Sequence, residues 1–483
     1  MSYIARQIKT FTMLFCIAAL AGACSKGFLE ITPKGKLIAQ GVSDYNLLLS
    51  NLDYLNVNTD AQVIMGDEMS AFEPYFTGAA LRTQRLFRYD DVIYEPNQDA
   101  TEMTVPMQNI YSYNKIINEV MQAAGGTDAQ KQSIRAEALT GRAWSYFLLI
   151  NYYGKPYNAA TAANDPGFPI ITAADVTASS FTRASVKAVY DFIVSDLTTA
   201  IQGLPVQTTH RLRMSKAAGE GLLGKVYMFM GRFSDARPLL AASLTDISTA
   251  SIPVRLYDYN ANFGTGGAFL PIGTFGPTYP TAPNNEENVY AKQFSNNWTF
   301  YANELPVSAA TMSLYGASDL RRKFYTSLPY PSGTAYPGGM MRRFGPGTSQ
   351  IGVVLPDLYL LSAECKARLN DLAGAKADVE ALRAKRMPAT DAPVPAVIAA
   401  DQAALTRFIL EERIREFAAE GYRWFDMRRL STDAAFSNTI SLTHTLYSAT
   451  GAVTATYALK PERFVLRFPQ KIMDQNPGMQ NNP

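Results

Sequence analysis

The stretch FILEERIREFAAEGYRWFDMRRL, residues Phe408–Leu430, decides how the rest of the chain folds. Its main apolar positions are spaced by four, three, four and three residues: Leu410, Ile414, Phe417, Gly421 and Trp424. This spacing places them on one face of an α-helix, and we expect that face to be buried. Because glycine inside a helix costs about 1 kcal/mol relative to alanine, we expect the helix to bend or restart at Gly421.

Charged residues occupy much of the rest of the same helix. Glu412, Glu416 and Glu420 run along the side roughly opposite the apolar face. Three aligned carboxylates could hold a metal or supply the acid/base pair of a glycosidase. Each glutamate, however, has an arginine within reach, and no histidine lies nearby. Since charge runs on helices are usually solvated, we interpret these glutamates as an exposed charged face.

The composition places broad limits on the function. The chain has 483 residues, 47% of them hydrophobic, and a net charge of +2. It can bury a large core, as one large domain or as several smaller ones. The charge balance does not favour a nucleic-acid groove or a polybasic membrane surface. His210 and His444 are the only histidines, so a zinc site or a Ser-His triad has few possible members, and we predict no metal and no cofactor.

Residues 1–23 have the features of a secretory leader. Arg6 and Lys9 give it a positive start, and its apolar run, Phe11–Leu20, is too short to span a membrane. Small residues precede Cys24 in the sequence LAGAC, which resembles a bacterial lipobox. Acylation of Cys24 would tether the protein, since each buried methylene adds about 0.8 kcal/mol of membrane affinity. The alternative is cleavage by an ordinary signal peptidase, which would leave a free periplasmic protein.

Several further segments have helical periodicity. They are Asn109–Ala123, Lys131–Gly154, Arg183–Pro205 and Tyr359–Arg383. Leu223–Ala236 contains the Leu-Gly-x-x-Tyr pattern and the later alanine of a tetratricopeptide repeat. The step from Asn370 to Ala375 repeats the step from Gly231 to Ala236. Because repeat helices cannot bury their faces alone, we predict a mostly α fold, in which tetratricopeptide-like helix pairs carry long loop insertions and a minor β component.

Three motifs lie near the two ends of the chain: the order EER, EF, EG, RWFD and RR within Phe408–Leu430, the closing segment Phe468–Pro483, and Cys24–Gly35 at the start. In this order they resemble the motifs of the SusD/RagB family. The resemblance implies a lipoprotein anchored through Cys24 in the outer membrane and facing the cell exterior. It also implies that the protein captures an oligosaccharide or a similar nutrient and delivers it to a SusC-like TonB-dependent transporter.

We predict one SusD-like domain, residues 24–483, after the signal peptide. Its parts are a helical 24–230, a loop-rich 231–354 with the ligand face, and a helical 355–483 with the family signature. The middle part holds two stretches, Asp258–Tyr301 and Tyr325–Gly347, in which aromatic residues are interleaved with glycine and proline. Loops this long in a compact protein are either functional or disordered, and aromatic residues fit disorder poorly.

Six residues are candidate ligand contacts: Asp67, Tyr75, Phe76, Tyr279, Trp298 and Tyr301. Sugar rings can lie on aromatic side chains, while their hydroxyls need amide and carboxylate partners. Asp67 lies in GDEMS, which resembles an aspartate-containing loop near the ligand face of the family. Trp298 is the only tryptophan outside the helical stretches, and we expect Trp144 and Trp424 in the core. For any single aromatic residue, the alternative is that it pins its loop to the helices.

No catalytic motif competes with the binding hypothesis. The chain has no Gly-x-Ser-x-Gly elbow, phosphate loop or His-Glu-x-x-His helix, so we predict no catalytic residue and no enzyme. A carboxylate-dependent glycoside hydrolase stays open, because its two acids need no fixed spacing. A helical-repeat scaffold that binds another protein also stays open, although it leaves the aromatic loops unexplained. The expected partners are a glycan, the transporter and a membrane through the lipid anchor, without nucleic acid.

Overall fold

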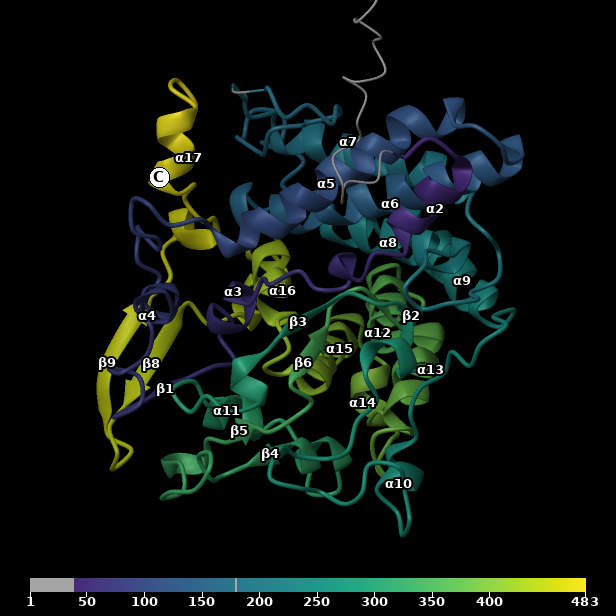
Figure 1. Cartoon of the computed structure of the whole chain (residues 1–483). Coiled ribbons are helices and arrows are strands. Elements are labelled where there is room, and N and C mark those ends of the chain that lie inside the picture. The colour runs from purple at the N-terminus through teal and green to yellow at the C-terminus, as the bar shows by residue number, and fades with distance from the viewer. Residues whose placement is uncertain (1–38, 179) are drawn as a thin grey trace, which may run out of the picture.

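Stacked helices are the main regular secondary structure of the protein (Figure 1). The computed structural model describes residues 39–178 and 180–483. The predicted signal peptide and Cys24 lie outside the described residues. Within the described residues, no helix combines the length and the apolar character needed to cross a membrane.

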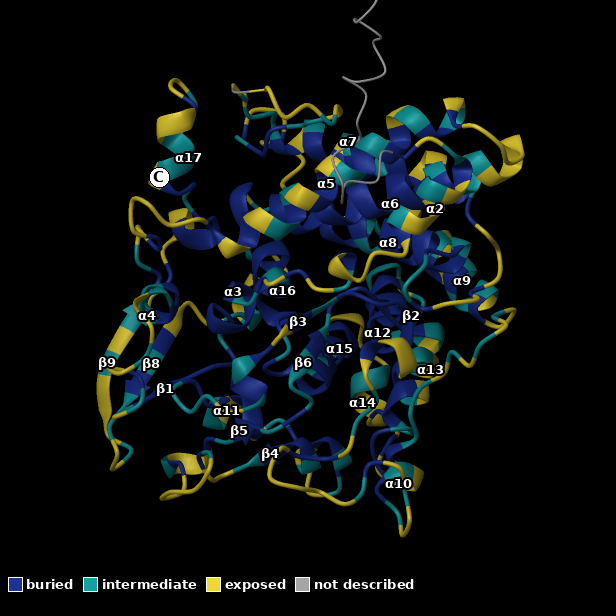
Figure 2. Cartoon of the chain, in the orientation of Figure 1, coloured by how far each residue is buried: buried dark blue, intermediate teal, exposed yellow. Residues whose placement is uncertain are grey.

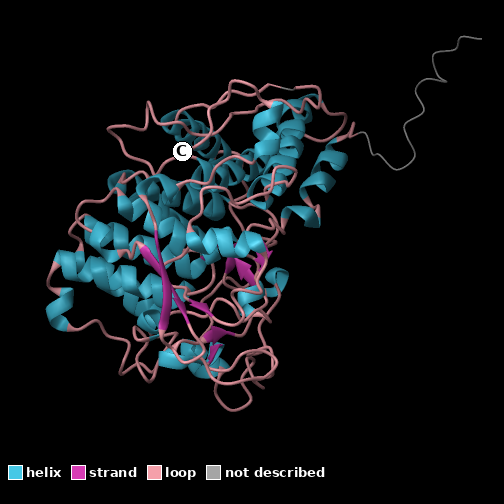
Figure 3. Cartoon of the chain, turned by 90° about the vertical axis from the view of Figure 1, so that its left-hand side faces the viewer, coloured by secondary structure: helices cyan, strands magenta, loops and turns pink. Residues whose placement is uncertain are grey.

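The elements confirm the predicted fold class, since helices dominate and the strands are short (Figure 3). The helices are α2 (Val42–Leu49), α3 (Ala61–Ile64), α4 (Leu81–Arg88), α5 (Thr101–Glu119), α6 (Asp128–Tyr153), α7 (Val186–Ile201), α8 (Lys216–Phe229), α9 (Phe233–Ile247), α10 (Tyr259–Asn262), α11 (Ala309–Met312), α12 (Leu355–Arg368), α13 (Leu372–Arg383), α14 (Ala396–Ala399), α15 (Gln402–Phe417), α16 (Arg423–Ser431) and α17 (Gln470–Gln475). The strands are β1 (Ala71–Phe72), β2 (Asn288–Tyr290), β3 (Gln293–Ser295), β4 (Tyr325–Thr326), β5 (Arg342–Arg343), β6 (Thr348–Gln350), β7 (Val353–Val354), β8 (Thr443–Tyr447) and β9 (Val453–Ala458).

The strands form small separate sheets beside the helices. The largest has the order β1-β8-β9, with β1 parallel to β8 and β8 antiparallel to β9. Within the loop-rich part, β2 pairs with β7, β3 with β6 and β4 with β5, all antiparallel. These short ladders tie segments of the insertion to one another.

The helices pack as successive pairs. From α5 to α9, each helix packs on its neighbour along the chain. Helix α12 packs on α13 and α15 and also on α8 and α9. The helices before and after the insertion therefore form one continuous stack. At the turns within two pairs, Gly231 and Asn370 have φ values of +70° and +62°. Ala236 and Ala375 are completely buried. The repeated step in the sequence therefore marks the same left-handed turn and the same packing position, which confirms the tetratricopeptide-like pairs.

Helix α5 begins at Thr101, earlier than the Asn109 that the periodicity predicts, and it contains Pro106. Proline inside a helix costs about 3 kcal/mol, so other contacts must stabilise the added turns. Glu102 is completely buried there and is bound by Arg82 of α4. A buried carboxylate needs such a partner, and this contact from outside the segment explains the early start.

The stretch that organises the chain forms two helices. Helix α15 ends at Phe417 and α16 begins at Arg423, and between them Ala419 and Gly421 have φ values of +63° and +85°. The predicted restart at Gly421 is confirmed. Across the break, the rings of Phe417 and Tyr422 stack with centroids 3.9 Å apart.

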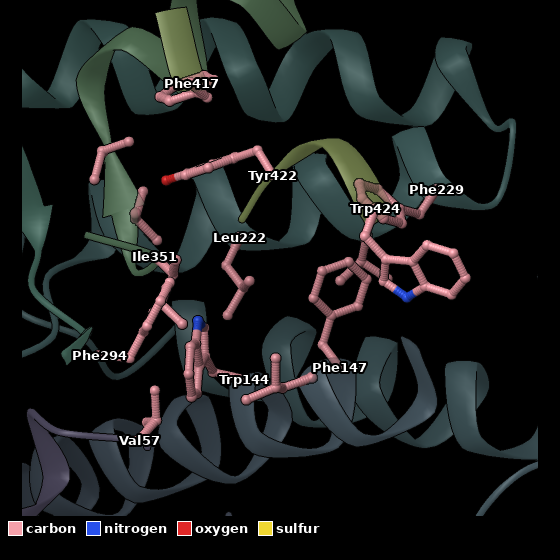
Figure 4. Close-up of a cluster of buried hydrophobic side chains, with 14 of the residues drawn as sticks. Val57, Trp144, Phe147, Leu222, Phe229, Phe294, Ile351, Phe417, Tyr422 and Trp424 are labelled. Atoms are coloured by element: carbon pink, nitrogen blue, oxygen red, sulfur yellow. The ribbon is translucent and has the colours of Figure 1, made fainter. Parts of the chain in front are cut away.

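The junction of α15 and α16 lies in the core. Figure 4 shows its rings facing Trp144 and Phe147 of α6 and Leu222 of α8. Trp424 is 1% exposed and Trp144 is 4% exposed, so both tryptophans are core residues as predicted. Figure 2 shows the same pattern for the whole molecule, with buried helix interiors and exposed loops.

The glutamate face of α15 is buried, so its interpretation as a solvated face is wrong. Glu412 is completely buried and accepts hydrogen bonds at 2.6 Å from both Arg321 and Arg383. Glu416 is bound by Arg321 at 2.9 Å and by Arg386 at 2.7 Å. Burial would raise the pKa of Glu412, but the surrounding arginines, Arg321 first, hold it at about 2. The carboxylates are ionised and act as internal anchors for arginines from other segments.

Candidate ligand-binding surface

Loops of the insertion converge beside β4 and β5, at the lower end of the molecule in Figure 1. Gly276 has a φ of +86° and lies against the carbonyl of Phe344, while Gly345 has a φ of +120° and lies against the carbonyl of Phe275. A side chain at either glycine would collide with the opposite backbone. These two glycines therefore let the loops touch and fix the position of Phe275.

Four aromatic side chains gather on these loops: Phe275, Phe300, Tyr301 and Tyr330. The ring of Phe275 is nearly parallel to those of Phe300 and Tyr330, with centroids 4.5 Å and 5.4 Å away. Tyr301 meets Phe300 edge-on at 5.4 Å. Phe275 is 45% exposed and Tyr301 is 49% exposed. We call these four residues the aromatic platform, because together they present apolar ring surface to solvent.

Asn303 holds two loops of the platform together. Its Nδ2 donates a hydrogen bond to the carbonyl of Tyr330 at 2.7 Å, and its Oδ1 accepts one from the amide of Tyr330 at 2.7 Å. The hydroxyl of Tyr336 donates to the carbonyl of Asn303 at 3.1 Å. Since the Nδ2 donor and the Oδ1 acceptor of Asn303 both bind the backbone of Tyr330, the Tyr330 loop is held in position before a ligand binds.

Tyr75 reaches the same region from the N-terminal part of the chain. Its ring lies 6.0 Å from that of Phe72, which meets Tyr336 edge-on at 5.2 Å. Tyr75 is half-buried, with its hydroxyl near Gly333. Of the six predicted contacts, Tyr75 and Tyr301 are therefore the two that lie at or beside the platform.

The other predicted contacts lie elsewhere. Phe76 and Trp298 are 2% and 3% exposed and belong to the hydrophobic core. The carboxylate of Asp67 is bound by Arg423 at 2.6 Å and 2.8 Å, which occupies both of its oxygens. Tyr279 packs on neighbouring rings of the insertion, with its hydroxyl 3.5 Å from Glu287. Their contact with a ligand stays a prediction, which for Phe76 and Trp298 would require surface that the folded protein covers.

Three platform residues were recognisable in the sequence only as aromatics on loops. Phe275, Phe300 and Tyr330 come from three separate loops, and no spacing along the chain pairs them. The signal that pointed to them was the joint enrichment of aromatic residues with glycine and proline. The sequence favoured Trp298 because it is the only tryptophan outside the helical stretches, yet large aromatic rings also contribute much apolar area to a core.

A polar cavity between the insertion and α15 bears on the hydrolase alternative. Its lining includes Glu287, Glu416, Glu420 and Arg343, and its volume is about 40 Å³. Burial raises the pKa of Glu287 and Glu420, as a general acid would require. The cavity admits a water molecule but no sugar ring, since small-molecule sites occupy about 300–1,000 Å³. Within residues 39–178 and 180–483, no cluster of His, Cys, Asp or Glu is arranged to hold a metal.

By fold, the protein is an interrupted helical-repeat scaffold with aromatic loops on one end. Two family models match it: one described as "Starch-binding associating with outer membrane" over residues 40–228, and one described as "SusD family" over residues 355–483. The chain belongs to the SusD family. No curated protein matches it.

Solved structures share the fold over nearly their whole length. A SusD superfamily protein from Bacteroides thetaiotaomicron is 18% identical, with a TM-score of 0.70 over 92% of this chain and 100% of the other. A putative sugar binding protein from Bacteroides vulgatus is 18% identical, with a TM-score of 0.68 over 93% and 99%. Surface glycan-binding protein A from Bacteroides uniformis is 16% identical, with a TM-score of 0.67 over 91% and 99%. At these identities the likeness concerns the fold.

Proposed function

We propose that the protein binds an oligosaccharide on the aromatic platform. The nearly parallel rings of Phe275, which is 45% exposed, and of the half-buried Phe300 and Tyr330 carry this proposal, because a pyranose presents a flat C–H face that packs on aromatic rings. Asn303 and the glycine contacts hold the rings in place, so little ordering is needed on binding. The starch-binding description of the family and the glycan-binding names of similar structures support the same class of ligand.

The same proposal includes a lipid anchor and a transport partner. The leader and the lipobox at Cys24 support acylation, and the family description places relatives at the outer membrane. Helix α2, the first described helix, lies at the upper end of Figure 1, away from β4 and β5. A protein tethered through the segment before α2 would have its platform on the far side. We therefore propose a lipoprotein facing the cell exterior that delivers its glycan to a SusC-like TonB-dependent transporter.

Affinity electrophoresis tests the binding proposal. The protein lacking residues 1–24 is run through gels that contain one polysaccharide each, from a panel of neutral and acidic plant, algal and animal glycans. We expect at least one polysaccharide to retard the protein. After incubation with the protein, the chain length of that polysaccharide should be unchanged. A panel that causes no retardation would contradict the proposal, and new reducing ends would favour the hydrolase alternative.

A further inference from the structure

Strand β5 and the residues after it support the aromatic platform through backbone contacts. Nη1 of Arg342 donates a hydrogen bond to the carbonyl of Phe300 at 3.0 Å. Gly345 lies against the carbonyl of Phe275, in the contact that brings the two loops together. The backbone at two rings of the platform is therefore held by the segment 342–345, and a shift of β5 would displace both.

One side chain from each strand of the β4–β5 pair reaches the junction of α15 and α16. From β5, Nη2 of Arg343 forms an ion pair with Glu420, and Nη1 donates to the hydroxyl of Tyr325 at 3.1 Å. From β4, the hydroxyl of Tyr325 donates to the carbonyl of Ala418 at 3.2 Å. Among the residues that the structure describes, Glu420 is the only carboxylate that forms an ion pair with Arg343. This ion pair is the charged connection between β5 and the helical core.

Glu420 is placed where it can exchange a proton with solvent. Its side chain is 17% exposed and lines the polar cavity together with Glu287 and Glu416. Burial and these two carboxylates raise the pKa of Glu420, although Arg343 and Arg386 oppose them. Because the ion pair with Arg343 requires an ionised carboxylate, it is lost at a higher pH than a pair formed by an ordinary glutamate.

The remaining titratable groups around Glu420 stay neutral over the same pH range. They are the hydroxyls of Tyr279, Tyr325 and Tyr422, and burial raises the pKa of each of them. Since the pKa of Glu420 is raised in the folded protein, the folded state takes up this proton more readily than the unfolded chain. Protonation of Glu420 therefore does not by itself favour unfolding, and the ion pair can be lost while the helices stay folded.

We infer that the ion pair of Arg343 with Glu420 positions the aromatic platform, and that protonation of Glu420 in mildly acidic solution releases β5 and weakens glycan binding. This inference rests on the proposed function and deepens it, because it gives the same site a regulation by pH. Arg343 and Glu420 are positioning residues, since they act on the rings through β5 and do not touch the glycan.

Hydrogen exchange followed by mass spectrometry tests the release of β5 without any ligand. The protein lacking residues 1–24 is compared at about pH 7.5 and about pH 5, with correction for the intrinsic pH dependence of exchange. We expect the peptides that cover 298–302 and 325–345 to exchange about fivefold faster or more at the lower pH, the lower end of the coupling between two sites. Glu420→Gln should show the faster exchange already at pH 7.5.

Glu287→Gln is the matched control for the cavity. Burial also raises the pKa of Glu287, but its carboxylate binds Arg386 and not β5. We therefore expect Glu287→Gln to keep the pH dependence of the wild type at 298–302 and 325–345. An equal loss of this dependence in Glu287→Gln would show a general response of the cavity and overturn the inference.

Calorimetric titration measures the effect on binding, with the polysaccharide that retards the wild type most strongly in the gels. We expect the wild type to bind it about fivefold more weakly or more at pH 5 than at pH 7.5. Glu420→Gln and Arg343→Met should bind with the lower affinity at both pH values, and the double variant should bind no more weakly than either. Arg343→Lys keeps the charge and should retain part of the pH dependence.

The outcomes separate the inference from the proposed function. Exchange at 325–345 that is equal at both pH values, or wild-type affinity in Glu420→Gln, overturns the inference and leaves glycan binding intact. A protein that binds no polysaccharide overturns the proposed function, while the exchange measurement still decides whether the ion pair holds β5. Should Arg343→Met fail to fold, the wild type and Glu420→Gln decide alone.

Discussion

Replacing Glu412 by glutamine tests whether the buried ion pairs of α15 with Arg321 and with Arg383 of α13 stabilise the folded protein. Glu412 accepts hydrogen bonds from Arg321 and Arg383 at 2.6 Å and from Arg415 at 2.8 Å. Glutamine keeps the shape of the side chain but removes the charge. Three guanidiniums then surround a neutral amide, so we expect Glu412→Gln to lower the free energy of unfolding by about 3–5 kcal/mol at pH 7.

The pKa of Glu412 gives a second route to this magnitude. Burial raises this pKa, but the arginines overcome that effect and move it from 4.5 to about 2. At 1.36 kcal/mol for each pKa unit, this shift corresponds to about 3 kcal/mol. Because the folded-state pKa is lowered, the contribution is complete above about pH 4.5 and is lost as the pH falls toward 2. The difference between wild type and variant should therefore shrink over that interval.

Urea unfolding of both proteins at pH 7 and at pH 3 measures the effect. Glu411→Gln is the matched control, since the Glu411 side chain is 38% exposed and, among the residues that the structure describes, forms an ion pair only with Arg415 at 3.2 Å. We expect that control to change stability by less than about 1 kcal/mol. If Glu412→Gln unfolds like the control at pH 7, the buried arginine cluster does not stabilise the fold and the reasoning is wrong.

Three further predictions follow from burial and from the leader. Trp298→Ala and Trp424→Ala should each lower the free energy of unfolding by about 3–5 kcal/mol, because each leaves a cavity in the core. A Trp298→Ala variant that melts like the wild type but no longer binds the ligand would instead support Trp298 as a ligand contact. Burial lowers the pKa of Lys292 to about 7. The stability of the wild type should therefore rise between about pH 7 and 10, where Lys292 is protonated only in the unfolded chain. Lys292→Met should remove this rise, and a variant with the pH profile of the wild type would refute the prediction. Cys24→Ser should move the protein from the membrane to the soluble fraction with an unchanged melting temperature, whereas full membrane retention would mean another anchor.

Local patterns predicted the helical scaffold well. The four-three spacing predicted burial of Leu410, Phe417 and Trp424, which is confirmed, although Ile414 is half-buried and the residues divide between two helices. Gly421 marked the break, because both features depend on residues close together in the chain. The repeated turn at Gly231 and Asn370 was also readable, since a left-handed turn favours these residue types. Such features survive in the fold because tertiary contacts reinforce them.

Features fixed by distant partners were not predictable in the same way. The glutamates of α15 look solvated in isolation, and only Arg321, Arg383 and Arg386 from other segments explain their burial. The start of α5 depends likewise on Arg82. The platform combines rings from three loops whose mutual distance is set by backbone contacts. The sequence identified the loops that carry these rings but favoured Trp298, which is buried in the core.

The central claim is that the aromatic platform binds a glycan. Phe275→Ala tests it most directly, by calorimetric titration with the panel polysaccharide that retards the wild type most strongly. Tyr111→Ala is the control, because Tyr111 is 39% exposed on α5, outside the platform. We predict that Phe275→Ala weakens binding by about 1–3 kcal/mol, that its melting temperature stays near that of the wild type, and that Tyr111→Ala binds normally. A folded Phe275→Ala with wild-type affinity would contradict the claim.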